Sequence, residues 1–143
     1  MSAIFEYQHT VCDEEIDGNG HVNNLAYLKW MQSAAVAHSA ALGWPMKRYR
    51  ESGSSWVARK HTIEYLKPAF LGETILIQTW IAGLRKATSL RKYLIRRVSD
   101  ETLLAKAETD WAFVGIEHHV PRRVPVEIRD AFPIVNEQDE PAP

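Results

Sequence analysis

One apolar segment near the start of the chain constrains the fold more than any other feature. Residues 25–42 (LAYLKWMQSAAVAHSAAL) are rich in alanine and leucine, and Lys29 is the only charge among them. An asparagine can cap the start of this segment and Gly43 supplies a stop signal just past its end, so we predict a helix over Asn24–Leu42. Because such a helix is apolar or small on nearly all sides, it must be buried on most of them.

Much of the remaining chain consists of strand-length runs of β-branched and aromatic residues, separated by turn signals. The last run alternates most clearly, with Leu103 and every second residue to Phe113 on one face and Leu104 with three charged residues on the other. This period of two predicts an antiparallel sheet with one covered face and one wetter face. The predicted strands are 4–13 before the helix, and 56–66, 73–83, 87–98 and 102–115 after it.

These elements predict an α+β fold in which a curled antiparallel sheet wraps one long central helix, since no second helix layer is available to bury it. We expect a single domain over residues 1–132 and a disordered tail over 133–143, which ends in the polar run NEQDEPAP. One sheet leaves an edge strand open and covers only part of the helix. We therefore also expect a homodimer, or a tetramer built from two dimers.

Composition and charge limit the classes of partner and compartment. Lys and Arg number 17 and Asp and Glu number 18, which gives a formal net charge of −1 and no global attraction to nucleic acid. Polar residues interrupt the helix and alanine contributes little membrane transfer energy, so no membrane association is expected. A single cysteine excludes a disulfide framework, and MSAIFEYQHT lacks a secretory-signal pattern. Both observations favour a cytoplasmic location.

The stretch DGNGHVNN, residues 17–24, concentrates the candidate chemistry directly before the predicted helix. Unpaired N–H groups and the positive dipole end at a helix start can polarise a carbonyl oxygen or stabilise an oxyanion. Asp17 would reach the same point, as a general base for water or as a nucleophile. The alternative is purely structural: Asp17 forms an Asx turn, an asparagine caps the helix, and His21 caps or packs.

The stretch VCDEEIDGNGHVNNLAYLKW, residues 11–30, resembles the hotdog-fold thioesterases of the 4-hydroxybenzoyl-CoA thioesterase and fatty acyl thioesterase group. The element D-x-x-x-H-V-N-N-x-x-Y-L carries the resemblance, and IEYLKPAFLGETILIQT and VPRRVPVEIRDAF are similar to later parts of that family. The resemblance covers about residues 5–132. It implies the hotdog fold and hydrolysis of an acyl thioester with no cofactor, since coenzyme A would be part of the substrate.

Carried over by position, the resemblance implies Asp17 as the catalytic aspartate and the backbone N–H of Asn24 as the donor to the thioester carbonyl. Plant acyl-carrier-protein thioesterases of this group implicate the Asp, Asn and His of D-x-N-x-H, which match Asp17, Asn19 and His21. Gly20 lies inside the same turn and is a candidate substrate contact.

The sequence departs from relatives that carry a glutamate on the central helix. The predicted helix holds no carboxylate, and Gln32 is the nearest analogue. Asp17 is therefore the acid or base candidate. No metal is expected either, because His118 and His119, as neighbours on a strand, would point to opposite faces.

Further candidate substrate contacts lie on the helix and the strands. Arg85 and Lys86 open an acid-free basic run, residues 85–97, and at a hairpin they would bind the phosphates of coenzyme A. The alternative for this run is a solvated strand surface. Tyr27 is either core or the lining of an acyl tunnel, and Val57 would face the catalytic turn of a partner subunit.

The sequence therefore predicts an acyl-thioester hydrolase acting on acyl-CoA or acyl-carrier-protein thioesters. One alternative is a hotdog-fold hydratase or dehydratase, whose related motif places the histidine one residue further along; turnover of enoyl-CoA would reveal it. The other is a non-catalytic acyl-CoA-binding or scaffold protein of the same fold. It would leave the thioester intact and would not need Asp17.

Overall fold

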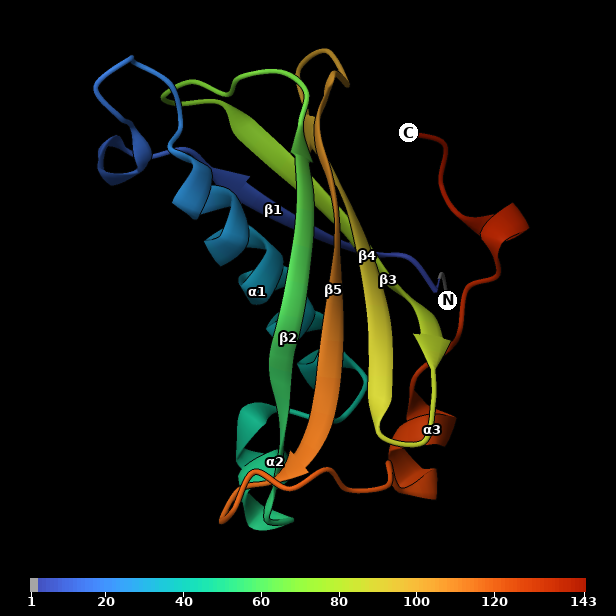
Figure 1. The fold of residues 1–143 in the computed structure, drawn as a ribbon. Helices are drawn as coiled ribbons and strands as arrows, with labels where there is room; N and C mark the ends of the chain where they lie inside the picture. Colours follow the sequence, from blue (N-terminus) through green and yellow to red (C-terminus); the bar gives the residue numbers. More distant parts are fainter. Residues whose placement is uncertain (1–2) are drawn as a thin grey trace.

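The computed structural model describes residues 3–143 and contains a five-stranded antiparallel sheet that curls around a long helix (Figure 1). The strand order is β1-β3-β4-β5-β2, so β1 and β2 are the edges. The predicted α+β fold with one wrapped helix is confirmed. The elements are β1 (Phe5–Thr10), η1 (Asp13–Glu15), α1 (Asn24–Ala41), α2 (Met46–Glu51), β2 (Ser54–Tyr65), β3 (Thr74–Leu84), β4 (Thr88–Arg97), β5 (Leu103–Gly115), α3 (Val126–Ala131) and η2 (Glu137–Asp139).

Helix α1 begins where the sequence predicts and ends one residue earlier. Its cap is Asn23, whose side chain accepts a hydrogen bond from the N–H of Ala26 at 2.9 Å. The prediction of burial on nearly all sides is only partly right, because Leu25 (72% exposed), Gln32 and Val36 (41% exposed) lie along an open stripe. A single protomer leaves this stripe uncovered. The inner face packs on the sheet through Ala26, Tyr27, Trp30, Met31 and Ala34.

A β-bulge in β5 changes which residues of that strand face the helix. The register of β5 shifts opposite Ile95 and Arg96 of β4, and Leu104 is the extra residue. Leu104 is fully buried in the core beneath α1, whereas Leu103 packs near Trp80 on the opposite face. The predicted alternation is therefore wrong at this end of β5, because one inserted residue exchanges the two faces.

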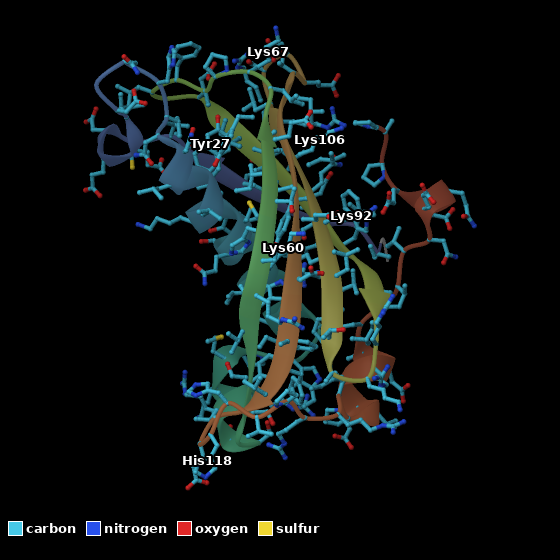
Figure 2. The ribbon with its side chains drawn as sticks, in the orientation of Figure 1. Tyr27, Lys60, Lys67, Lys92, Lys106 and His118 are labelled. Atoms are coloured by element: carbon cyan, nitrogen blue, oxygen red, sulfur yellow. The ribbon has the colours of Figure 1, made fainter. Side chains whose placement is uncertain are left out.

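The C-terminal tail packs on the face of the sheet opposite α1 (Figure 1). Val135 is buried against Trp80, and the indole N–H of Trp80 donates a hydrogen bond of 3.0 Å to Glu140. Lys92 forms an ion pair of 3.0 Å with the same carboxylate, and Figure 2 shows it on the side of the sheet that faces the tail. The polar composition predicts disorder from residue 133, whereas the structure packs this segment on the sheet. Val135 and Glu140 hold it there, and the sequence does not reveal the patch that they contact.

Two packed clusters divide the interior along α1. The first lies under the N-terminal half of the helix and includes Tyr27 and Trp30. The second lies at the far end, where α2 and α3 close the sheet, and includes Trp44, Tyr49 and Phe132. Figure 2 shows Tyr27 and His118 toward opposite ends of the molecule. Within residues 3–143, no helix is both long enough and apolar enough to cross a membrane.

Candidate active site

Asp17 organises a tight turn immediately before α1. Its Oδ1 accepts hydrogen bonds from the backbone N–H groups of Asn19 at 2.8 Å and His21 at 3.3 Å. Gly20 has a φ of +80°, a conformation that a side chain would strain, and its N–H donates to the carbonyl of Asp17. Asp17 therefore forms an Asx turn. The second oxygen, Oδ2, has no hydrogen bond from any residue of 3–143, and the side chain is exposed.

The other members of the predicted motif project from the same turn. Asn19 and His21 are both exposed, and the His21 ring packs edge-on against Phe70 with 5.3 Å between centroids. Buried Val22 fixes the turn to the body of the protein, since its N–H donates to the carbonyl of Ala69 at 2.9 Å. The structure thus brings the four predicted turn residues together at the entry to α1.

The first turn of α1 offers hydrogen-bond donors close to this carboxylate. Asn23 satisfies the N–H of Ala26, so the N–H groups of Asn24 and Leu25 remain without an intrahelical partner. No acidic residue lies in this first turn, and the positive end of the helix dipole is not neutralised there. A carbonyl oxygen at this point would gain a hydrogen bond and a favourable dipole.

Glu15, which the sequence analysis did not single out, anchors the entry to the helix. Its oxygens lie 2.8 Å from His9 Nε2 and 2.7 Å from Trp30 Nε1, and it accepts the N–H of Cys12 at 3.0 Å. Burial raises the pKa of Glu15, but these hydrogen bonds outweigh burial and leave the pKa below its ordinary value. Glu15 is therefore a positioning group, and Asp17 is the carboxylate left open. Capping-box spacing from Cys12 was the signal available in the sequence.

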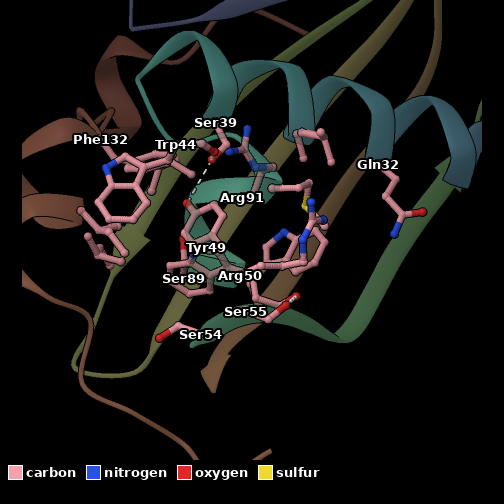
Figure 3. Close-up of a pocket in the computed structure, with 18 residues that line it drawn as sticks. Gln32, Ser39, Trp44, Tyr49, Arg50, Ser54, Ser55, Ser89, Arg91 and Phe132 are labelled. Carbon is pink, nitrogen blue, oxygen red and sulfur yellow. Dashed lines mark hydrogen bonds between the residues drawn. The ribbon is translucent and has the colours of Figure 1, made fainter. Parts of the chain in front are cut away.

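A cavity of about 140 Å³ lies at the far end of α1 (Figure 3). Gln32 is eight residues beyond Asn24 and Ser39 is fifteen, which corresponds to about 12 and 22 Å at the helical rise. The cavity therefore stands well apart from the Asp17 turn of the same chain. Its mainly aromatic and apolar lining includes Val36, Trp44, Tyr49, Trp56, Trp111 and Phe132.

A buried arginine lines this cavity. Arg91 is 4% exposed, and its Nη1 donates to His38 Nδ1 at 3.0 Å and to Thr79 Oγ1 at 2.9 Å. Burial, with the Arg91 charge adding to it, lowers the pKa of His38 to about 4, so the ring is neutral near pH 7 and can accept this bond. The interpretation of residues 85–97 as a solvated surface is wrong here. Alternation with buried Tyr93 on β4 was the signal that Arg91 faces inward.

Two predicted substrate contacts do not line the cavity. Tyr27 is buried in the core with the Tyr65 ring 5.1 Å away, and burial raises its pKa to about 12. Val57 lies on β2 and is 39% exposed, while its neighbours Ser55 and Trp56 line the cavity. Contact between substrate and Tyr27 or Val57 stays a prediction.

The β3–β4 hairpin carries two predicted cations, and Arg85 lines a second hollow instead of the cavity. Arg85 and Lys86 are both exposed, and they directly follow Leu84, which lines the cavity. The guanidinium of Arg129 on α3 donates to the backbone carbonyls of Arg85 and Lys86, which fixes the hairpin while leaving the two side chains in solvent.

The described residues contain no cluster suited to a metal ion. Within 3–143, no three His, Cys, Asp or Glu side chains come close enough to hold one. His118 and His119 lie in a turn beyond β5, so the prediction that they are neighbours on a strand is wrong.

Several known proteins resemble this chain in structure or in sequence. Slr0204, a 1,4-dihydroxy-2-naphthoyl-CoA thioesterase from Synechocystis, superposes with a TM-score of 0.83 at 19% identity, over 90% of this chain and 94% of that chain. An acyl-acyl carrier protein thioesterase of Arabidopsis thaliana (ATL3, chloroplastic) is 24% identical over 140 residues, 98% of this chain and 73% of the relative. The putative acyl-CoA thioesterase YneP of Bacillus subtilis (strain 168) is 29% identical over 119 residues, 83% of each chain.

The wrapped helix and the turn before it define a protein of the hotdog fold, as the resemblance implies. A profile of the thioesterase-like superfamily matches residues 11–132. The chain therefore belongs to the thioesterase-like superfamily, and thioester hydrolysis is supported as its general reaction.

Proposed function

We propose that this protein hydrolyses acyl-CoA or acyl-carrier-protein thioesters to a free acid and a thiol, with Asp17 as the reacting carboxylate. The observation that carries the proposal is the open Oδ2 of Asp17 on a fixed turn, directly before the unpaired N–H groups of α1. Family membership supports the type of reaction. The names of the relatives, one an acyl-CoA and one an acyl carrier protein thioesterase, support both carriers.

The turn and the helix start divide the chemistry between them. As general base, Asp17 takes a proton from a water molecule whose oxygen attacks the thioester carbon. The N–H of Asn24 stabilises the resulting oxyanion, and collapse breaks the C–S bond as the thiolate leaves with the proton. As nucleophile, the Asp17 carboxylate would instead attack the thioester carbon and expel the thiolate, and water would then hydrolyse the resulting mixed anhydride to the free acid and regenerate Asp17. Asn19 and His21 flank the carboxylate and orient the attacking water and the thioester. None of these steps requires a cofactor.

A second copy of the chain completes the site. β2 is an edge strand, with Ser54 at the cavity and Tyr65 bonded to the carbonyl of Asn24 at the start of α1. Antiparallel pairing of β2 with the same strand of another protomer would set the Ser54 end of one beside the Tyr65 end of the other. The Asp17 turn of each protomer would then meet the cavity of its partner, near Val57. The exposed stripe of α1 would be covered in the same contact.

The cavity and the β3–β4 hairpin supply binding sites for the two ends of the substrate. The aromatic cavity takes the acyl group, since such pockets bury most of a small apolar ligand. Arg85 and Lys86, which directly follow Leu84 of the cavity along the chain, bind the phosphates of coenzyme A or of a carrier-protein arm.

Thiol release from a panel of acyl-CoA thioesters, measured alongside hydration of enoyl-CoA, tests the function. We expect thiol release with saturated acyl-CoA and no hydration product. Hydration without thiol release would identify the hydratase alternative. Tight binding of an acyl-CoA that is recovered intact would identify a binding protein. Either result would overturn the proposal.

A further inference from the structure

The cavity contains a cation that the described residues leave without a counter-ion. Of the three guanidinium nitrogens of Arg91, only Nη1 has hydrogen-bond partners within residues 3–143, and both partners are neutral. Nε and Nη2 form no hydrogen bond with these residues. No carboxylate of 3–143 pairs with this guanidinium, although burial is complete enough to lower its pKa.

The other polar groups around the cavity are neutral donors or acceptors, apart from Arg50, an exposed cation at α2, and no carboxylate of residues 3–143 lines the cavity. Tyr49 lies near the guanidinium and shares a hydrogen bond of 3.0 Å with Ser39 (Figure 3), and burial raises the pKa of Tyr49. Trp111 lines the cavity, and its buried Nε1 lies near the hydroxyl of Tyr93 without forming a hydrogen bond of ordinary geometry. A buried charge without an opposite charge is costly, and unpaired donors beside it add to that cost. Both costs fall if the occupant of the cavity carries an anionic acceptor.

The open atoms of Arg91 have the geometry for one particular acceptor. Nε–H and one N–H of Nη2 are parallel and lie in one plane, an arrangement that a carboxylate matches with two charge-assisted hydrogen bonds. A cavity of about 140 Å³ leaves room for a compact acyl group beside that carboxylate.

From this arrangement we infer that the acyl group bound in the cavity carries a second carboxylate at its far end, which Arg91 binds through Nε and Nη2. The preferred substrates are therefore monothioesters of short dicarboxylic acids. This inference rests on the proposed thioesterase function. A plain acyl group of equal length would leave the guanidinium buried and unpaired, and such a mismatch in a polar site discriminates strongly.

Matched pairs of substrates test the inference. The pairs are ω-carboxyacyl-CoA and plain acyl-CoA thioesters of equal length, from four to eight carbons, and the measurement is kcat/KM for each. We expect at least about a tenfold preference for the carboxylated member at one or more lengths. In Arg91→Met, a neutral change of similar length, that preference should vanish or reverse. Equal rates within every pair, or a preference for the plain member, would overturn the inference.

Controls separate the carboxylate site from folding and from net charge. Arg91→Lys keeps the charge but loses the paired donors, so it should retain only part of the preference. This variant also tests the role of Arg91 if Arg91→Met does not fold. Arg123→Met removes an exposed arginine outside the cavity and should leave the preference unchanged. A preference lost equally in Arg123→Met would point to net charge and overturn the role of Arg91.

Binding measurements distinguish this inference from the proposed function. Stable thioethers, S-(5-carboxypentyl)-CoA and S-hexyl-CoA, can be compared by calorimetry whether or not the protein hydrolyses anything. Tighter binding of the carboxylated thioether, lost in Arg91→Met, supports the inference even if no thioester is cleaved. Free hexanoate is tested as a third ligand in the same calorimetric experiment. If it binds in an Arg91-dependent manner while the two thioethers bind equally, the site holds free acids and the inferred substrate class is wrong.

Discussion

The phenol of Tyr65 donates a hydrogen bond of 3.2 Å to the backbone carbonyl of Asn24, which joins the end of β2 to the first turn of α1. The opposite end of the same strand, at Ser54 and Trp56, lines the cavity. The single edge strand β2 therefore runs from the first turn of α1 to the aromatic cavity. If two chains pair through β2, the Asp17 turn of one chain would lie beside the cavity of the other.

The first prediction concerns the charge of Asp17. In Asp17→Asn the amide oxygen can still accept the N–H groups of Asn19 and His21, so the turn should persist while its basicity is lost. We expect kcat to fall at least about 10²-fold with little change in unfolding free energy. Thiol-release kinetics and urea denaturation measure the two effects. Asp13→Asn removes an exposed carboxylate nearby and is the matched control. Near-normal hydrolysis by folded Asp17→Asn would contradict the mechanism.

The second prediction concerns assembly. Because the cavity and the Asp17 turn stand apart within one chain, we expect a dimer or a tetramer whose dissociation abolishes activity. Size-exclusion chromatography with light scattering gives the mass, and specific activity on dilution follows dissociation. A stable monomer of 16.3 kDa with full activity would be incompatible with the paired arrangement.

The third prediction concerns pH. The pKa of buried His38 is lowered to about 4 from an ordinary value of 6.5, so the unfolded chain binds a proton that the folded chain does not. This contribution to stability is present above pH 6.5 and is lost as the pH falls toward 4. We expect a loss on the order of 2 kcal/mol between pH 7 and pH 5 from this group.

Urea denaturation at the two pH values measures that loss. His38→Asn retains an acceptor for Arg91 but does not titrate, so its stability should depend less on pH by about this amount. An unchanged pH dependence in the variant would show that His38 is not the responsible group.

The fourth prediction concerns the hairpin cations. Replacing Arg85 and Lys86 by Ala should raise KM for acyl-CoA and change kcat little, because the phosphates lie far from the reacting carbon. The backbone carbonyls that bind Arg129 are unaffected by these substitutions, so the hairpin should remain in place. A truncated acyl-pantetheine substrate is the control, and an equal loss with it would refute phosphate binding.

The sequence predicts the elements well because each follows from local chemistry. The cap at Asn23 and the glycine after α1 define the helix, and alternation defines the strands to within a few residues. The face exchange at Leu104 could not be predicted, because a bulge depends on how two strands pair. The same limit applies to the tail, since Val135 is buried in a cluster with Trp80 of β3 and Leu94 of β4, which lie far from it in sequence.

The candidate site, like the fold, could be predicted only in part from the sequence. Asp17, Asn19, Gly20 and His21 are adjacent in sequence, and the structure brings them together as expected. Arg91 was missed because a basic run suggests a solvated surface, and its burial follows from strand parity and from the helix packed above it.

The separation of turn and cavity along α1 has a consequence for genetics. If each active centre takes its carboxylate from one chain and its acyl cavity from the other, an allele encoding Asp17→Asn and an allele with a filled cavity are each inactive alone. A mixed dimer of the two products carries one doubly defective centre and one fully intact centre. Two null alleles expressed in the same cell would then complement one another. Each mixed dimer would have about half the activity of a wild-type dimer.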